Sequence, residues 1–437
     1  MTTRRSFWQP AAATLAGAEI ALGRVNANSK PSELRITDLR VAVTAKSPMT
    51  IPLIRIDTNQ GISGFGEVYA YGSKTYALML KSRLLGENPC NVDKVFRKIK
   101  QFGFHARQAG GVSGVEMALW DLAGKAYGVP VYQMLGGKFR NQIRCYADTD
   151  MSPDPRTYGQ RLRQRLDKGF TFLKMDLGIG LIERTPGALT RPLGLTTGAT
   201  ANTQHMFTGF ELTDRGIALM AEYVAQVREV AGMEVPLAAD HFGHIGVNSC
   251  IRLGKALTKY NLAWLEDMIP WQHADLLKQI ADAVDIPILT GEDIYLKESF
   301  LELFRKHAID MIQPDVGTAG GILETKKVGD LAQEYGIPMV LHCAGTPVAS
   351  MAAVHCAAAT ENFLVLEHHA VDVPWWDDMV EGVEKPIVNR GFIRVPDRPG
   401  LGVTLNDAVV KQHLLEPGYF EPTPQWDRLD SWDRLWS

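Results

Sequence analysis

Three carboxylates in the second half of the chain recur at an equal interval. Asp240, Glu266 and Glu292 each follow an apolar run, and successive members lie 26 residues apart. Equal spacing across consecutive strand–helix units predicts the same height on adjacent strands. Three converging carboxylates repel one another unless a cation lies among them, and hard oxygen ligands suit Mg²⁺. The spacing therefore predicts a site for one Mg²⁺ per chain, although a single strand-end acid is usually solvated or caps the next helix.

The three following apolar runs end in Asp315, His342 and Glu367. His342 comes directly after the apolar segment "IPMVL", where an imidazole is costly to bury without a partner. A carboxylate on the neighbouring strand would hold the imidazole in one tautomer and raise its basicity. Asp315 and His342 together therefore predict a general base or acid, whereas a lone histidine would be interpreted as a satisfied core residue.

Two further positions carry charge near the same strand ends. Lys174 and Asp176 lie two residues apart in "FLKMDLG", so both point the same way along a strand. They either face a substrate or form an ion pair across a barrel interior, and the two interpretations are compatible. His241 follows Asp240 in "DHFGHIG". It either reaches a substrate or caps a helix and contacts solvent.

Short β-prone runs alternate with helical segments from about residue 142 onward. The runs are "QIRCYAD", "FTFLKMD", "VPLAAD", "LAWLED", "IPILTGED", "IDMIQPD", "IPMVLHC" and "NFLVLEH". Eight strand–helix units predict an α/β protein with a (β/α)₈ TIM-type barrel, whose chemistry lies at the carboxyl ends of the strands. A doubly wound sheet is the rival fold, but the glycine-rich phosphate turn that it needs is missing.

The remaining segments predict a second unit. Strand-like alternation in residues 35–68 and helical spacing in 74–135 indicate an N-terminal α+β domain. We expect this capping domain at 29–140, the barrel at 141–370, and a C-terminal segment at 371–437 that returns to the capping domain. Residues 178–213 form a long Gly-, Thr- and Pro-rich insertion, which is typical of a lid, a binding loop or an oligomer contact.

The N-terminus and the composition limit where the protein is located and which partners it binds. Residues 1–28 begin with Arg4-Arg5 and continue into a short apolar stretch, which resembles a twin-arginine export signal; a disordered leader is the alternative. An export signal predicts a periplasmic or exported protein, and a disordered leader predicts a cytoplasmic one. A net charge of −3 without a basic run argues against a nucleic-acid partner, and no apolar stretch is long enough to span a membrane. Five scattered cysteines without a CxxC motif signal neither a disulfide framework nor a zinc site.

The motifs around these residues resemble the enolase superfamily, in its mandelate racemase-like subgroup, over nearly all of the chain after residue 35. They are "GVEMALWDLAGKAYGVPVYQMLGG", "WLEDMIPW", "IQPDVGTAGGI", "LHCAG" and "LEHH". The resemblance implies a capping domain on a barrel, and a Lys or His base that works with Mg²⁺ on a carboxylate substrate. A large barrel of this kind is expected to form a homo-oligomer.

The resemblance also implies a role for each matching residue. Asp240, Glu266 and Glu292 correspond to the Mg²⁺ ligands, and Asp315 and His342 to the Asp-His dyad. Glu367 corresponds to the acid that donates a hydrogen bond to the substrate carboxylate, and Lys174 adds positive charge nearby. Residues 44–50 and 67–74, which include Tyr69, resemble the mobile loops that close over the substrate.

One departure from the family pattern bears on the reaction. Racemases of the subgroup carry Lys-x-Lys on the second strand, whereas Lys174-Met175-Asp176 stands here. Because only the His342 face is clearly equipped with a base, we expect β-elimination: dehydration of a sugar acid (an aldonate or aldarate) to a 2-keto-3-deoxy acid. An epimerase, racemase or cycloisomerase that uses Asp176 or Lys174 is the first alternative. A non-catalytic sugar-acid-binding relative is the second.

Overall fold

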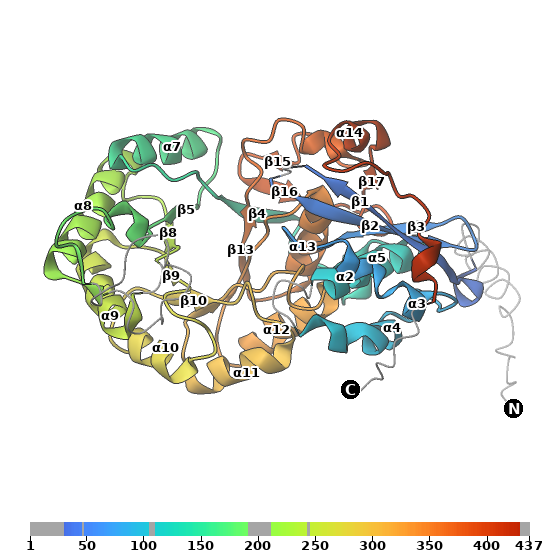
Figure 1. The fold of residues 1–437 in the computed structure, drawn as a ribbon, viewed down its shortest axis with the longest axis horizontal. Coiled ribbons are helices and arrows are strands. Elements are labelled where there is room, and N and C mark those ends of the chain that lie inside the picture. The colour runs from blue at the N-terminus through green and yellow to red at the C-terminus, as the bar shows by residue number, and fades with distance from the viewer. Residues whose placement is uncertain (1–29, 46–47, 105–109, 191–210, 243–244, 429–437) are drawn as a thin grey trace, which may run out of the picture.

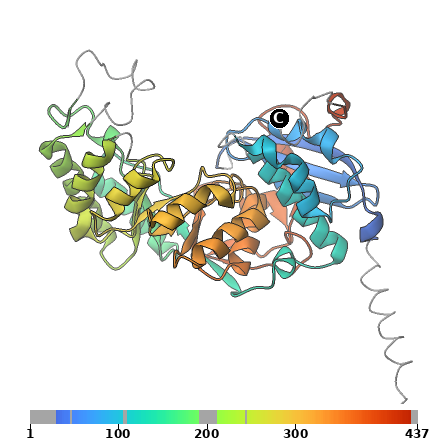
Figure 2. The same cartoon turned by 90° about the horizontal axis from the view of Figure 1, so that it is seen from below.

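The chain folds into two units that lie side by side (Figures 1 and 2). The computed structural model describes residues 30–45, 48–104, 110–190, 211–242 and 245–428. The expected leader at 1–28 and most of the insertion at 178–213 lie outside the described residues. Within the described part of the chain, no helix is long and apolar enough to cross a membrane.

Eight parallel strands close into a barrel, which confirms the predicted fold class. Neighbouring strands pair in the order β13-β12-β11-β10-β9-β8-β5-β4, and β13 pairs with β4 to close the ring. The strands are β4 (Gln142–Ala147), β5 (Leu173–Asp176), β8 (Leu237–Asp240), β9 (Leu265–Glu266), β10 (Ile288–Thr290), β11 (Met311–Ile312), β12 (Met339–Leu341) and β13 (Phe363–His368). The eight apolar runs of the sequence supply these eight strands.

Helices follow the first seven barrel strands and lie outside the ring (Figure 1). They are α7 (Pro155–Asp167), α8 (Asp214–Ala231), α9 (Gly246–Leu257), α10 (Ala274–Ala281), α11 (Lys297–Lys306), α12 (Ile322–Gln333) and α13 (Pro347–Ala359). Local signals set their ends. The Thr213 side chain accepts a hydrogen bond from the Gly216 N–H at the start of α8, and Gly232 ends that helix with a φ of 95°.

The barrel interior below the strand ends is filled by large side chains. Tyr146, Phe172 and Trp264 pack together there, with Trp264 at 5.6 Å and 5.0 Å from the other two ring centroids. Leu289, Val340 and Val365 complete this cluster. Among the described residues, this cluster fills the barrel below the strand ends, and the polar strand-end groups lie on its carboxyl side.

The N-terminal unit is the predicted α+β domain. Its antiparallel sheet consists of β1 (Ile36–Thr44), β2 (Ile51–Thr58) and β3 (Ser63–Glu67), and its helices are α2 (Thr75–Leu78), α3 (Lys81–Leu84), α4 (Val92–Ile99), α5 (Gly110–Tyr127) and α6 (Val131–Met134). Helix α5 packs directly on β3. A Cβ at Gly66 would lie 1.9 Å from the Gly114 carbonyl oxygen, so this close approach requires glycine.

The C-terminal segment returns to the N-terminal unit, as predicted. The Leu415 N–H donates to the Val43 carbonyl at 2.8 Å, and the Ala45 N–H donates to the His413 carbonyl at 2.7 Å. The remaining elements are β6 (Leu189–Thr190) paired with β7 (Glu211–Leu212), β14 (Val380–Glu381) paired with β17 (Thr404–Leu405), the hairpin of β15 (Val388–Asn389) and β16 (Phe392–Arg394), and α14 (Asp407–Gln412). Short 3₁₀ turns are η1 (Pro31–Glu33), η2 (Lys100–Gly103), η4 (Ile179–Leu181), η6 (Thr258–Tyr260), η7 (Asp377–Met379) and η8 (Pro424–Trp426).

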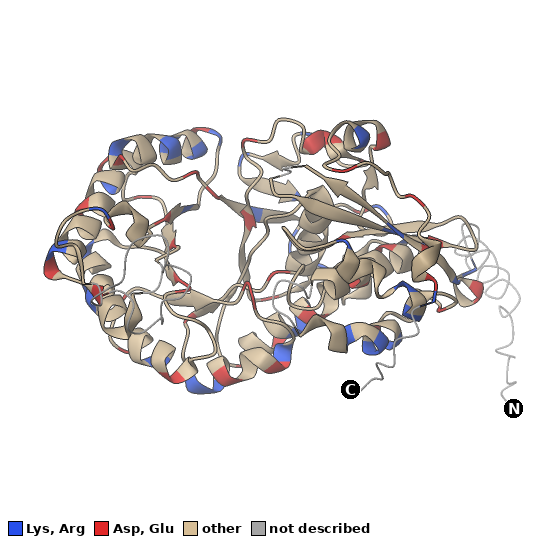
Figure 3. Cartoon of the chain, viewed as in Figure 1, with Lys and Arg blue, Asp and Glu red and all other residues tan. Residues whose placement is uncertain are grey.

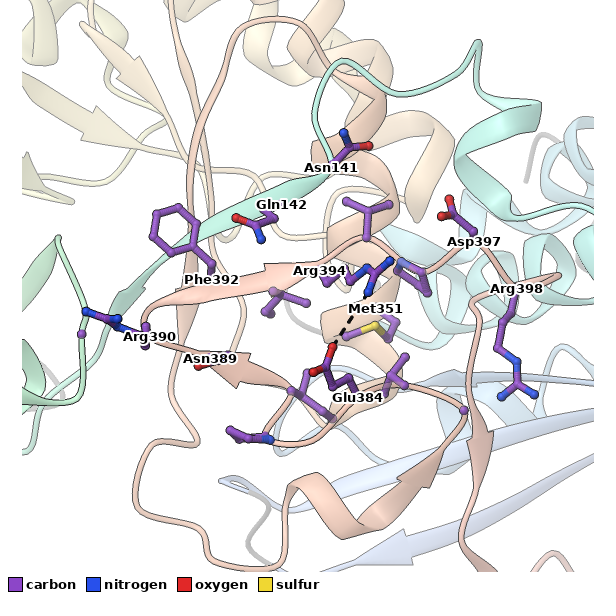
Figure 4. A pocket seen from close by; sticks show the side chains of 18 of the residues that line it. Asn141, Gln142, Met351, Glu384, Asn389, Arg390, Phe392, Arg394, Asp397 and Arg398 are labelled. Carbon is purple, nitrogen blue, oxygen red and sulfur yellow. Dashed lines mark ion pairs between the residues drawn. The ribbon is translucent and has the colours of Figure 1, made fainter.

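A cavity of about 820 Å³ lies beside the amino end of β4, where β16 extends the sheet in the antiparallel direction. Gln142, Phe392 and Arg394 are among its lining residues (Figure 4). Its charged groups are exposed, and Arg394 and Glu384 approach to only 4.0 Å. The residues predicted to do chemistry lie elsewhere, at the carboxyl ends of the strands.

Candidate active site

Lys174 lies at the centre of the carboxyl end of the barrel. Its Nζ is 2.9 Å from Asp240 Oδ2, 3.4 Å from Glu266 Oε1 and 2.8 Å from Glu367 Oε1. Only 1% of the side chain is exposed. Burial alone would lower the lysine pKa, but the surrounding carboxylates outweigh it and hold the pKa well above its usual value. Lys174 is therefore a buried cation among acids, and the predicted ion pair across the barrel interior is present.

The strand register decides how the three equally spaced carboxylates are arranged. Leu265 pairs with Ala239, so Glu266 and Asp240 lie at the same height on adjacent strands. Glu266 itself pairs with Leu289, so Glu292 lies three residues farther along the next chain segment. Strand β10 ends at Thr290, and the chain turns at Gly291. Equal spacing therefore predicts the height of two carboxylates, while the strand register places the third beyond the end of β10.

The donor set fits a hard divalent cation. Glu266 is fully buried, and burial together with the Asp240 and Glu367 charges raises its pKa well above the usual value, against the opposing charge of Lys174. Such repulsion is what a cation relieves. Among the described residues, two groups have ligand atoms within 4.8 Å of one another: His342, Glu367 and His369, and Asp176, Asp240 and His241. Asp240 is the only predicted metal ligand in these two groups.

His342 and Asp315 are brought together as predicted. His342 Nδ1 lies 2.5 Å from Asp315 Oδ2, and the two residues form a parallel bridge between their chain segments. An Nδ1–H that donates to the carboxylate leaves Nε2 free to accept a proton. Nε2 lies 3.2 Å from Glu292 Oε2 and 3.4 Å from Glu367 Oε2. This pair has the geometry of an oriented imidazole base.

The groups around Glu367 bear on the charge of its carboxyl. Burial would raise the pKa of this carboxyl, but Lys174, His342 and His369 outweigh it and hold the pKa well below the usual value. The arrangement therefore favours an ionised Glu367, whereas the resemblance implied a group that donates a hydrogen bond. Both Glu367 oxygens are buried beside nitrogen atoms: Oε1 lies 2.8 Å from Lys174 Nζ and Oε2 lies 3.4 Å from His342 Nε2, although within the described chain neither contact has hydrogen-bond geometry. A ligand group that donates a hydrogen bond could therefore still bind to these oxygens.

Asp176 and His241 form a smaller cluster at the edge of the site. Asp176 pairs with Asp240 in the strand register, and His241 Nδ1 lies 3.2 Å from Asp176 Oδ1 and 3.0 Å from Asp240 Oδ2. These two hydrogen-bonded carboxylates raise the pKa of His241 to about 11. The His241 side chain is 67% exposed, so it faces the open side of the site. Asp176 thus contacts His241.

The N-terminal unit supplies one wall of the site. Tyr69 is buried, with its ring centroid 6.0 Å from that of His342. The neighbouring Glu67 accepts hydrogen bonds from the N–H groups of Thr346, at 3.2 Å, and Ala349, at 3.3 Å, at the start of α13. Burial raises the pKa of Glu67 to about 8. The expected loop at 67–74 is therefore anchored to the barrel at its first residue.

Sequence reasoning missed one pair of residues in the site. Asp148 follows β4, His369 follows β13, and His369 Nδ1 lies 3.2 Å from Asp148 Oδ2. The signals were available, because the first apolar run ends in Asp148 and "LEHH" ends in His369. Figure 3 shows the wider charge pattern: acidic segments ring the barrel centre, while Lys and Arg lie mostly on the outer helices.

Comparisons with known proteins match both units. Residues 25–136 match the model of the mandelate racemase / muconate lactonizing enzyme N-terminal domain, and residues 157–409 match the enolase C-terminal domain-like model. The chain belongs to the enolase superfamily, in its mandelate racemase-like group. The resemblance stated from the motifs is thereby confirmed.

Individual relatives agree with this family. The chain is 33% identical to a D-xylonate dehydratase of Haloferax volcanii over 394 residues, which cover 88% of this chain and 90% of that protein. It is 28% identical to an arabinonate dehydratase of Saccharolobus solfataricus, with coverage of 86% and 93%. A crystal structure of a mandelate racemase/muconate lactonizing enzyme-like protein from Rubrobacter xylanophilus superposes with a TM-score of 0.79 at 31% identity, covering 89% of this chain and 99% of that one.

Proposed function

We propose that the protein is a Mg²⁺-dependent hydro-lyase that converts an aldonate or aldarate into a 2-keto-3-deoxy acid. The observation that carries this proposal is the meeting of Lys174, three buried carboxylates and the Asp315–His342 pair at one end of the barrel. The names of the relatives, which include dehydratases of D-xylonate, arabinonate and D-galactonate, support the same reaction class.

Asp240, Glu266 and Glu292 would hold one Mg²⁺. When bound, the ion supplies a Lewis acid that stabilises negative charge on the substrate carboxylate. Without such help, the proton α to a carboxylate is far too weakly acidic for a side chain to remove. The buried charges around Lys174 are consistent with this use, because they act in a region from which water is excluded.

The chain's own residues would position the substrate and move the proton. The Lys174 ammonium places a second positive charge beside the substrate carboxylate. The neutral form of His342 would remove the α-proton through Nε2, since an Nδ1–H that donates to Asp315 leaves this nitrogen free. Lys174 is a poor second base because its neighbours hold its pKa well above the usual value. Racemisation that uses Lys174 would need it as the second base, so the site favours elimination over that reaction.

The direct test is a substrate screen with metal removal. Purified protein is incubated with a panel of aldonates and aldarates that begins with D-xylonate, D-arabinonate and D-galactonate, and 2-keto acid is measured. We expect one or a few acids to react, with activity lost after treatment with EDTA and restored by Mg²⁺. Formation of no keto acid from any member, or full activity in the metal-free protein, would contradict the proposal. α-Proton exchange that labels both stereoisomers without elimination would instead identify an epimerase.

A further inference from the structure

A second Asp–His pair lies where the barrel closes. Strands β13 and β4 are neighbours there, and the Asp148 N–H donates to the His368 carbonyl at 3.2 Å. This contact places the residues that follow the two strands beside each other. His369 Nδ1 lies 3.2 Å from Asp148 Oδ2, so the carboxylate can hold the ring as Asp315 holds His342. The pair is therefore built by the strand register.

The other nitrogen of His369 points into the site. Nε2 lies 3.2 Å from Glu367 Oε1, while His342 Nε2 lies 3.4 Å from Glu367 Oε2. The centroids of the two imidazole rings are 5.8 Å apart. His369 Nε2 is buried and has no hydrogen-bond partner of suitable geometry among the described residues. Two imidazoles thus face one carboxylate, each with a nitrogen available to a ligand.

The surroundings of His369 favour its protonated form. Burial alone would lower the imidazole pKa, but the charges of Glu367 and Asp148 outweigh it and raise the pKa to about 10. Lys174 is the opposing positive charge nearby, and it is itself neutralised by three carboxylates. An imidazolium with one nitrogen held by a carboxylate and the other directed into the site can donate a proton.

We propose that His369 is the catalytic acid that protonates the departing β-hydroxyl, a role that rests on the dehydratase function proposed above. His342 takes the α-proton, and the electrons of the C2–H bond first move into the substrate carboxylate to give an enolate; these electrons then return to form the C2=C3 double bond. The C3–O bond breaks, and its oxygen takes the Nε2 proton of His369 and leaves as water. His342 then returns its proton to C3 of the enol, and the enol hydroxyl proton returns to His369. Both imidazoles end in their starting states.

The adjacent His368 is the same residue type in different surroundings, and it lacks the contacts that suit His369 to this role. His368 is buried on the opposite side of β13, where it packs against Trp376 with ring centroids 4.9 Å apart. Burial and the nearby charges of His369 and Arg165 lower its pKa to about 3. His368 is therefore a neutral core residue, and His368→Gln is a matched control for changes at His369.

The test distinguishes a variant that cannot protonate the leaving group from a variant that cannot remove the α-proton. His369→Asn and His368→Gln are assayed with the aldonate that the wild-type protein dehydrates and with its 3-deoxy-3-fluoro analogue. Fluoride leaves without a proton, so we expect His369→Asn to lose about 10²–10⁴-fold in kcat on the hydroxy acid but less than about tenfold on the fluoro acid. In D₂O, the variant should still exchange the α-proton of the hydroxy acid, because His342 is intact. His368→Gln should show no difference between the two substrates.

Each other outcome has a distinct meaning. Equal losses on both substrates in a folded His369→Asn protein would overturn the acid role and indicate a structural one. Undiminished dehydration by this variant would also overturn the role while leaving the dehydratase function intact. If the wild-type protein neither dehydrates an acid nor exchanges an α-proton, the proposed function fails, and the role of His369 fails with it. Melting temperatures of all variants identify any that do not fold.

Discussion

Two Asp–His pairs stand at different places around the same barrel end, and they differ in closeness and in surroundings. Asp315 and His342 approach to 2.5 Å, with each side chain no more than 5% exposed. Asp148 and His369 approach to 3.2 Å, and their side chains are 22% and 13% exposed. The first pair is thus the more tightly held, and the second is more open to solvent.

The second difference lies in what each free nitrogen faces. His342 Nε2 faces Glu292, a predicted Mg²⁺ ligand, as well as Glu367. His369 Nε2 faces Glu367 alone among these carboxylates. A base must act where the proposed Mg²⁺ would stabilise developing charge, whereas an acid for the leaving group acts one carbon farther away. The comparison therefore assigns abstraction to one imidazole and protonation to the other.

Replacement of His342 should have the largest effect. His342→Asn removes the base, so we expect loss of dehydration and of α-proton exchange together, each by at least about 10³-fold. The fluoro analogue should not restore activity, in contrast with His369→Asn. Proton NMR in D₂O measures exchange, and Mg²⁺ titration verifies that the variant still binds metal. Retained exchange in this variant would show that another group removes the α-proton.

Replacement of Asp148 should have an intermediate effect. Asp148→Asn keeps the imidazole but removes the charge that orients it, and a hydrogen bond to a charged group contributes about 1.5–3 kcal/mol. We expect dehydration of the hydroxy acid to fall by about ten- to a hundredfold, with little change for the fluoro acid. Steady-state kcat values on both substrates measure this. A loss on both substrates equally would contradict the pairing of Asp148 with the acid.

The smallest effect concerns stability and separates His368 from His369. The folded-state pKa of His368, about 3, is below its ordinary value of 6.5. Its contribution to stability is therefore present above pH 6.5 and is lost as the pH falls toward 3, by about 1.4 kcal/mol per pH unit. Denaturant unfolding between pH 6 and pH 4 should show a shallower loss in His368→Gln than in wild type. An equal slope in both proteins would show that His368 is not held neutral.

His369 should behave in the opposite way. Its folded-state pKa of about 10 lies above the ordinary value of 6.5. Its contribution is therefore fully present below pH 6.5 and is lost as the pH rises toward 10. In the alkaline range, His369→Asn should lose less stability with rising pH than the wild-type protein.

The barrel could be predicted from the sequence because each apolar run is short, ends in a polar residue and alternates with a helix. The neighbouring positions of Asp315 and His342 followed from the same pattern. The position of Glu292 did not, because the register between β9 and β10 pairs Glu266 with Leu289, three residues before Glu292. The Asp148–His369 contact depends on closure between the first and last strands, and that long-range pairing leaves no periodic signal in the chain.

Other predictions stay predictions. The Mg²⁺ ligands, the role of each site residue, the domain boundaries, the homo-oligomer and the export signal depend on bound ligands, partners or residues outside the described chain. The charge of Glu367 shows why site chemistry is harder to predict than fold. Its ionisation depends on Lys174, His342 and His369, which come from three separate strand ends.

The location of solvent deuterium in the product tests the central claim most directly. Wild-type protein with Mg²⁺ is allowed to turn over its aldonate in D₂O, and the product is examined by proton NMR. The account predicts a 2-keto-3-deoxy acid that carries one deuterium at C3, because His342 removes the α-proton, exchanges it with the solvent and delivers a deuteron to C3 after water leaves. Recovery of unreacted acid with its α-proton unexchanged, across the whole panel and with Mg²⁺ bound, would contradict it.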